Sequence, residues 1–253
     1  MVMHDYHKEG EKVVLLLHPM LASGEMMYHL LGRQLGENVR CLAPDFASHG
    51  AERGKEFAGA STEAEQIMAY LEQNGITHID LAYGASLGGV VLTQLLRRKL
   101  SFTTAFFEGT SFFEGAKIMT KLVSGVFLKK HKRAVADHER AVKAMGALYG
   151  EAYAQEFADQ FISMSDNSIR KIAESCGDNR HADLTAEEQS RCIFAYGSKD
   201  MNVPEAKKKC KKVYPKSKLV FWEGYDHCER VVADTDGYVR MLSAYLNGGP
   251  GAV

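Results

Sequence analysis

The chain has 253 residues, of which 45% are hydrophobic and 25% are charged, a balance typical of globular proteins. This length suits one α/β domain with an insertion better than two independent domains, and a core of this size needs neither disulfides nor metals. The formal net charge of -1 provides no overall field for nucleic acid or an anionic membrane, so we expect neither as a partner. Two local basic runs, at 129–133 and 207–212, are expected to lie on solvated helix faces.

Cysteine usage indicates the compartment. The five cysteines are scattered, odd in number and form no C-x-x-C pair. Because the N-terminus also lacks the pattern of a signal peptide, we expect reduced thiols in a cytoplasmic protein. The apolar stretches are far shorter than the roughly 18 residues that a membrane-spanning helix needs.

In chain order, strand-like and helix-like segments alternate, which predicts a mostly parallel sheet covered by helices on both faces. Residues 2–7 are expected to add an antiparallel edge strand. Short apolar runs typical of buried strands lie at 13–17, 39–43, 79–83, 103–107, 192–196 and 219–222. Helical patterns lie at 25–36, 61–74, 87–99, 204–213 and 229–246, and a glycine-rich tail at 248–251.

The interval 111–189 interrupts this alternation. It contains no clear strand, but several stretches have helical periodicity, for example residues 152–162. A helical block of this size, inserted between two strands of a parallel sheet, is typical of a lid. We therefore assign residues 1–110 and 190–253 to one core domain and residues 111–189 to a helical cap.

The strongest chemical signal is the sequence Gly84-Ala85-Ser86-Leu87-Gly88. A strand-like run ends at Tyr83 and a helical pattern begins directly after the serine, which is the setting of a nucleophile elbow. The turn is so sharp that side chains two residues before and after the serine would collide, which explains both glycines. Ser86 would then lie at the positive end of a helix, where developing negative charge is stabilised. We predict Ser86 as the nucleophile.

A serine hydroxyl needs a base, and the base needs an acceptor that orients it. In proteins with such an elbow, both follow later in the chain, in the order serine, acid, histidine. Asp200 lies just past the fifth of the buried runs and His227 just past the last, so we predict them as acid and base. Two other carboxylates compete with Asp200: Glu108, which follows the fourth run, and Asp226, which adjoins the histidine.

An oxyanion hole needs two backbone N–H donors directed at one point. One would be the N–H of Leu87, the residue after the nucleophile. The other would come from the loop after the first central strand, and because Pro19 has no N–H, we predict Met20. No histidine cluster has metal-ligand spacing and no glycine-rich phosphate loop occurs, so we expect neither a metal nor a cofactor.

These residues resemble the α/β-hydrolase superfamily, and the likeness extends from about residue 12 to residue 246. His18-Pro19 is similar to the His-Gly before the family's oxyanion loop, and residues 44–50 are similar to its P-D-x-x-G-H-G segment. The resemblance implies the α/β-hydrolase fold. That fold has an eight-stranded, mostly parallel sheet flanked by helices, with a helical cap inserted after the sixth strand.

The chain also departs from the family pattern. Pro19 stands where the family has glycine, which restricts the geometry of the oxyanion loop. Ser48 also stands where glycine is usual, so we expect structural roles for Asp45 and His49. The N-terminus is short, so we expect the family's first strand to be missing.

The resemblance implies acyl transfer to water through an acyl-enzyme, with a carboxylic ester as the default substrate. A thioesterase, a lactonase and a carbon–carbon bond hydrolase would share the same residues. A small apolar or aromatic substrate is expected if apolar side chains of the cap and the oxyanion loop face the cleft; the alternative is that they pack the cap onto the core. A function of another class is a small-molecule receptor with a slow hydrolase site. The apolar side chains in question are Met20, Leu21, Phe112, Phe113, Met119, Leu122, Val123 and Phe127.

Overall fold

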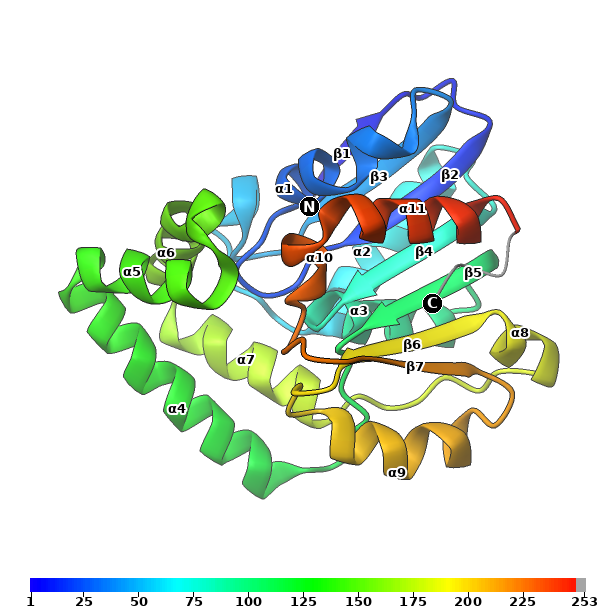
Figure 1. Ribbon diagram of the computed structural model, residues 1–253. Coiled ribbons are helices and arrows are strands. Elements are labelled where there is room, and N and C mark those ends of the chain that lie inside the picture. The colour runs from blue at the N-terminus through cyan, green and yellow to red at the C-terminus, as the bar shows by residue number, and fades with distance from the viewer. Residues whose placement is uncertain (249–253) are drawn as a thin grey trace.

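The computed structural model describes residues 1–248, which are built around a seven-stranded sheet in the order β1-β3-β2-β4-β5-β6-β7 (Figure 1). β1 pairs antiparallel with β3, and every other pair in the sheet is parallel. The prediction of a mostly parallel sheet with an antiparallel edge strand is confirmed, with seven strands where the family has eight. The strands are β1 (Val2–Tyr6), β2 (Lys12–Leu17), β3 (Val39–Asp45), β4 (Ile79–Ala85), β5 (Phe102–Glu108), β6 (Cys192–Gly197) and β7 (Lys218–Trp222).

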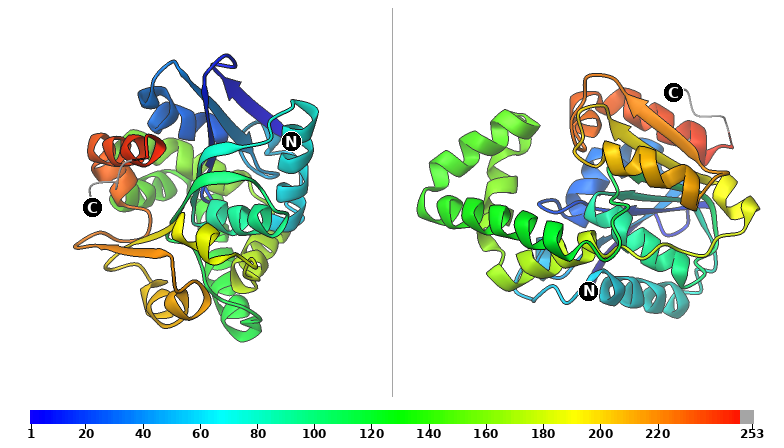
Figure 2. Two further views of the ribbon diagram at one scale, coloured as in Figure 1. Left: turned by 90° about the vertical axis from the view of Figure 1, so that its right-hand side faces the viewer. Right: turned by 90° about the horizontal axis from the view of Figure 1, so that it is seen from below.

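Helices cover both faces of the sheet, which is why its central strands are continuous apolar runs. α1 and α11 lie on one face, and α2 and α3 lie on the other (Figures 1 and 2). The helices of the core are α1 (Gly24–Leu30), α2 (Ala60–Gln73), α3 (Leu87–Arg97), α8 (Ala186–Ser190), α9 (Val203–Val213), α10 (Arg230–Ala233) and α11 (Thr235–Leu246).

Two helices expected from the sequence are divided in the structure. The segment 25–36 forms α1 and then a separate 3-10 helix, Gly32–Leu35. The segment 229–246 is divided at Asp234, whose side chain accepts a hydrogen bond from the Gly237 N–H at 3.2 Å and so caps α11. The tail expected at 248–251 lies, apart from Gly248, outside the described residues.

Between β5 and β6 the chain forms four long helices, which we call the helical insertion. They are α4 (Lys117–Ala136), α5 (His138–Tyr149), α6 (Ala154–Ser163) and α7 (Asp166–Gly177), with a short 3-10 helix at Glu151–Tyr153. They lie beyond the carboxyl ends of the parallel strands (Figure 1). Within residues 1–248, no helix is both long enough and apolar enough to cross a membrane.

The inner half of the helical insertion is attached to the core by polar contacts. The Gln160 side chain of α6 donates to the Ser48 carbonyl oxygen at 2.7 Å and accepts from the Gly50 N–H at 3.1 Å. Ser168 of α7 accepts from the Phe57 N–H at 3.0 Å. α4 packs on the other helices of the insertion, mainly on α7. The outer helix α4 is therefore held through α6 and α7.

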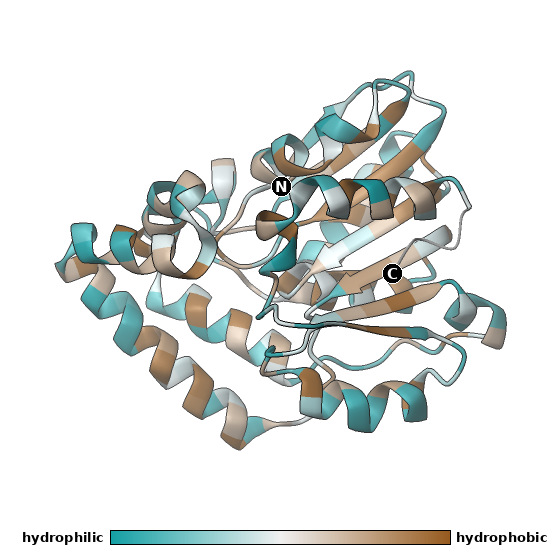
Figure 3. Cartoon of the chain, in the orientation of Figure 1, coloured by the Kyte–Doolittle hydropathy of each residue, from teal (hydrophilic) through white to brown (hydrophobic). Residues whose placement is uncertain are grey.

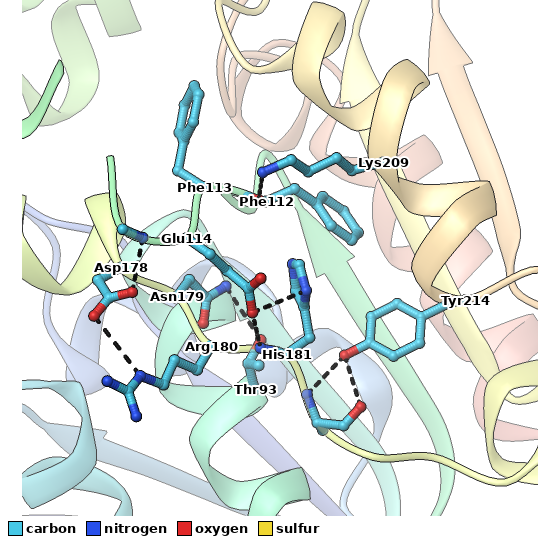
Figure 4. Close-up of polar contacts among 12 residues, drawn as sticks. Thr93, Phe112, Phe113, Glu114, Asp178, Asn179, Arg180, His181, Lys209 and Tyr214 are labelled. Atoms are coloured by element: carbon cyan, nitrogen blue, oxygen red, sulfur yellow. Dashed lines mark hydrogen bonds and ion pairs between the residues drawn. The ribbon is translucent and has the colours of Figure 1, made fainter. Parts of the chain in front are cut away.

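The two connections of the insertion are joined to each other (Figure 4). The Asn179 N–H donates to the Phe113 carbonyl oxygen and its side chain donates to the Ser111 carbonyl oxygen, both at 2.8 Å. The His181 N–H donates to the Glu114 carboxylate at 3.0 Å. The segment that enters the insertion and the segment that returns from it therefore run side by side and are held together by hydrogen bonds.

The residues similar to the family's P-D-x-x-G-H-G segment form a buried network. Asp45 accepts hydrogen bonds from the N–H groups of Gly24 (2.7 Å) and Ala51 (2.8 Å). His49 is fully buried and its Nδ1 lies 3.0 Å from the Ala47 carbonyl oxygen. These contacts bind the loop after β3 to its surroundings, and neither side chain lines the cavity described below.

Glu63 of α2 supports the same loop from inside the protein. Its Oε2 accepts from the Ala47 N–H at 3.3 Å, while Oε1 has no hydrogen-bond partner among the described residues. Burial raises the pKa of Glu63 from its ordinary 4.5 to about 7. Between these two values the unfolded chain loses a proton that the folded protein retains. The free energy of unfolding should therefore fall as the pH rises through this window.

Replacing Glu63 by Gln should remove this pH dependence, because an amide keeps the acceptor for Ala47 but cannot ionise. We expect the difference in the free energy of unfolding, variant minus wild type, to increase from pH 5 to pH 8 by at most about 3 kcal/mol. Urea unfolding at both pH values measures the gain. If the two proteins differ equally at pH 5 and pH 8, Glu63 does not titrate in this window.

Candidate active site

Ser86 lies in a strained turn between β4 and α3. Its φ of 50° and ψ of -109° are rare for a residue with a side chain. The Ser86 N–H donates to the Glu108 carbonyl oxygen of β5 at 2.8 Å. A Cβ at Gly84 would lie 2.6 Å from the Gly88 carbonyl oxygen, and one at Gly88 would overlap the Leu17 carbonyl of β2. The turn therefore needs both glycines: a side chain at Gly84 would collide with Gly88, and a side chain at Gly88 would collide with the neighbouring strand β2.

The structure brings Ser86, His227 and Asp200 together. His227 Nε2 lies 2.9 Å from Ser86 Oγ, across 141 positions of sequence, and its Nδ1 lies 2.8 Å from Asp200 Oδ2. Since a carboxylate only accepts, Nδ1 carries the proton and Nε2 is free to accept from the serine hydroxyl. The second oxygen of Asp200 accepts from the Asn202 N–H at 2.8 Å, so the carboxylate is held on both sides.

The two competing carboxylates have other partners. Glu108 is buried, and its Oε2 accepts from the Tyr83 hydroxyl at 2.8 Å and the Tyr238 hydroxyl at 2.6 Å. Burial raises the pKa of Glu108 although both hydroxyls oppose the shift. Asp226 Oδ1 accepts from the backbone N–H of His227 at 2.7 Å. Among the three carboxylates, it is Asp200 that lies within hydrogen-bond distance of the imidazole ring.

The pKa of His227 reflects two opposing influences. Burial disfavours the charged ring, whereas the Asp200 carboxylate, hydrogen-bonded to Nδ1, favours it and raises the pKa of His227. Burial also raises the pKa of Cys228 to about 11, so this thiol is neutral at pH 7. A ring with a raised pKa accepts a proton readily, which suits a general base.

Two backbone N–H groups are available beside Ser86. The N–H groups of Leu87 and Met20 donate to no group among residues 1–248, and both residues line the same cavity as Ser86. His18 holds the loop of Met20 in place: its Nδ1–H donates to the Pro19 carbonyl oxygen at 2.8 Å, and its Nε2 accepts from the Phe46 N–H at 3.1 Å. Burial lowers the pKa of His18 well below its ordinary value, so the ring stays neutral and keeps both contacts.

The cavity beside Ser86 has a volume of about 300 Å³ and mostly apolar walls. One wall comes from the loops of the core and the other from the helical insertion. Of the apolar residues considered from the sequence, Phe112 is instead buried against Phe194 and Tyr214, and Leu122 is exposed to solvent. Those that line the cavity are Met20, Leu21, Phe113, Met119, Val123 and Phe127.

The polar side chains of the insertion that line this cavity are mostly occupied. Ser111 donates to the Cys176 carbonyl oxygen at 2.6 Å, and Thr120 donates to the Ala116 carbonyl oxygen at 2.9 Å. The Tyr149 hydroxyl, by contrast, makes no hydrogen bond to any described residue. Burial raises the pKa of Tyr149, so its hydroxyl is a neutral donor at pH 7. This group is free to bind a ligand oxygen.

Sequence reasoning did not find Asn202, Tyr149 or Cys228. Asn202 follows the acid by two positions and its side chain donates to the Gly109 carbonyl oxygen at 3.0 Å, which ties the acid loop to the end of β5. A polar residue two positions after Asp200 was an available signal for this role. Tyr149 reaches the site through packing, whereas Cys228 lies there because it directly follows His227 in the chain. Within residues 1–248, no group of three or more histidine, cysteine or carboxylate side chains is arranged for a metal ion.

No protein-family model matches the chain, and no curated protein matches its sequence. Solved structures do match. A Desulfitobacterium hafniense protein assigned to the α/β-hydrolase family has a TM-score of 0.73 at 13% identity, over 97% of this chain and 100% of that one. The esterase from Exiguobacterium antarcticum has a TM-score of 0.73 at 18% identity, over 97% and 94%. MenH from S. aureus has a TM-score of 0.69 at 17% identity, over 98% and 97%.

These likenesses cover nearly the whole chain at low identity, and they show that it has the α/β-hydrolase fold. The seven strands and the flanking helices agree with that assignment. The fold that the sequence resemblance implies is therefore confirmed.

The reactivity of Ser86 should depend on Asp200 and not on Glu108. Asp200→Asn would place an amide donor against Nδ1 and favour the tautomer whose Nε2 carries the proton, so His227 could not accept from Ser86. We expect labelling of Ser86 by a fluorophosphonate to slow by at least about 10³-fold. In the control, Glu108→Gln, labelling should stay within about 10-fold, because its contacts are to tyrosines. The reverse ranking would make Glu108 the orienting acid.

Proposed function

We propose that the chain is a serine hydrolase that cleaves carboxylic esters, with Ser86 as nucleophile, His227 as base and Asp200 as orienting acid. The observation that carries the proposal is the continuous hydrogen-bond chain through these three side chains at the wall of an apolar cavity. That some proteins of similar structure are esterases, such as the one from Exiguobacterium antarcticum, fits this proposal.

In the first half of the reaction, Ser86 Oγ attacks the ester carbonyl carbon while its proton passes to His227 Nε2. The N–H groups of Met20 and Leu87 stabilise the negative charge on the carbonyl oxygen. When the tetrahedral species collapses, the bond to the leaving oxygen breaks and that oxygen takes the proton from His227. An alcohol leaves, and the acyl group remains on Ser86.

In the second half, water takes the place of the alcohol. His227 accepts a proton from the water as its oxygen attacks the acyl carbon, and collapse returns that proton to Ser86 Oγ and releases the carboxylic acid. Throughout, Asp200 holds the Nδ1 proton and stabilises the imidazolium. These steps require only the side chains of the site, the two backbone N–H groups and water.

The substrate we propose is small and carries an apolar or aromatic acyl group. The cavity of about 300 Å³ lies at the lower end of the roughly 300–1,000 Å³ range of ligand sites, and its walls are mostly apolar. We also propose that the helical insertion acts as a cap, because Met119, Val123 and Phe127 of α4 form one wall. Thioesters, lactones and activated carbon–carbon bonds could enter the same cavity.

Ser86→Ala should abolish hydrolysis of p-nitrophenyl esters, reducing kcat by about 10⁴-fold or more, because no other group supplies the covalent nucleophile. We expect wild-type rates to be highest for short and medium acyl chains and to fall once the chain exceeds the cavity. The assay is a series of acyl lengths run in parallel on both proteins. Ligand-dependent thermal stabilisation with negligible turnover would instead indicate a small-molecule receptor.

Tyr149 should bind an oxygen of the substrate through its unpaired hydroxyl. Tyr149→Phe keeps the ring that packs on Phe157 and removes one hydrogen bond, which contributes about 0.5–1.5 kcal/mol. We expect kcat/KM to fall by about 2- to 10-fold for an ester with a second oxygen in its acyl group, and to stay unchanged for the matched hydrocarbon ester. An equal loss for both esters would show that Tyr149 acts through packing.

A further inference from the structure

α4 exposes apolar side chains to solvent on its outer side. Ile118 is 81% exposed, Leu122 62% and Val126 55%, and their four-residue spacing places them in one stripe along the helix. Hydrophobic residues recur along this helix (Figure 3). Contiguous apolar surface of this kind is uncommon on globular proteins and often marks a site of interaction with a protein or a membrane.

The same helix carries a concentrated positive charge. Its 20 residues contain no aspartate or glutamate, and its six lysine and arginine side chains are all exposed. None of them forms an ion pair with a described residue; the carboxylate contact of this helix is the one between His131 Nδ1 and Asp166 Oδ1, at 3.4 Å. The net charge of -1 for the whole chain conceals this local excess. The six cations are Lys117, Lys121, Lys129, Lys130, Lys132 and Arg133.

The inner side of α4 belongs to the cavity. Met119, Val123 and Phe127 line it, one turn apart, while the apolar stripe lies on the solvent side of the same turns. The N-terminal half of α4 is therefore apolar on two sides, and it separates the cavity from the surroundings by a single helix.

We propose that the outer face of α4 docks on the surface of an anionic phospholipid membrane. Ile118, Leu122 and Val126 would enter the boundary between headgroups and acyl chains, and the lysines would lie among the phosphates. A fluid lipid surface accepts single apolar side chains and cations together without shape complementarity. The docked helix would hold the cavity against a phase in which apolar esters concentrate; this last consequence alone rests on the proposed function.

A second copy of the chain fits this face less well. A symmetric dimer formed through α4 would place the six cations of one helix opposite the six of its partner, with no carboxylate on either. That arrangement opposes association, whereas anionic lipid neutralises it.

The test is co-sedimentation of the Ser86→Ala protein with phosphatidylglycerol vesicles and with phosphatidylcholine vesicles. Catalysis is absent from this measurement, so its failure is distinct from a failure of the proposed hydrolase. We expect at least 10-fold tighter binding to the anionic vesicles, and a loss of that difference in 0.5 M salt. Equal binding to both vesicles, or binding to neither, would overturn the proposal.

Two double variants locate the surface. Lys117→Glu/Lys121→Glu, in the first two turns of α4 where acidic residues suit the helix dipole, should weaken binding at least 10-fold. The matched control, Lys208→Glu/Lys212→Glu on α9, makes the same change of charge at the same spacing in the other basic run, and should alter binding less than 2-fold. Equal losses in the two variants would show non-specific attraction and contradict docking through α4.

Leu122→Ser/Val126→Ser removes the apolar stripe from exposed positions and should also weaken vesicle binding at least 10-fold. The same two substitutions, made in the protein that retains Ser86, should leave the hydrolysis of p-nitrophenyl acetate in solution unchanged, because neither residue lines the cavity. If light scattering shows a wild-type dimer that this variant dissociates, the stripe is covered by a second copy and the membrane proposal is wrong.

Discussion

The arrangement of the site depends on the close contact of three strand ends beneath Ser86. The Ser86 N–H is bonded to the carbonyl of Glu108 on β5, and Gly88 lies against the Leu17 carbonyl of β2. These contacts leave the serine no freedom to relax its backbone, so the turn stays strained with the hydroxyl raised above the sheet. Once that point is fixed, the loops after β2, β6 and β7 need only reach it from their own strand ends.

Parallel strands make this convergence possible. Their carboxyl ends share one edge of the sheet, so residues far apart in sequence become neighbours when each follows a strand by a few positions. Met20 follows β2, Asp200 follows β6 and His227 follows β7. The position of each of these residues near Ser86 was predictable, because its place relative to a strand end is a local property and the sheet order brings the strand ends together.

Features that depend on packing between distant segments were not predictable in this way. The sequence left Glu108 and Asp200 as rival acids, and the structure separates them because two tyrosines from β4 and α11 approach Glu108. Likewise, the sequence identified apolar residues between 119 and 127 as candidates for lining the cleft but could not decide which of them face it. The tertiary contacts place Val123 inward and Leu122 outward, although the two residues are adjacent.

The helices of the insertion have to provide an apolar wall for the cavity and also a surface that faces solvent. A cavity wall must be apolar, and a helix on the outside of a protein is normally polar on its free face. α6 and α7 resolve the conflict by bonding to the core through Gln160 and Ser168, so their apolar faces are covered. α4 lies one layer further out and has helices on one side only, so apolar residues on its other side remain in solvent. Its six exposed cations offset these apolar residues, because the charged ends of lysine and arginine stay hydrated, and they would favour an anionic surface over a neutral one.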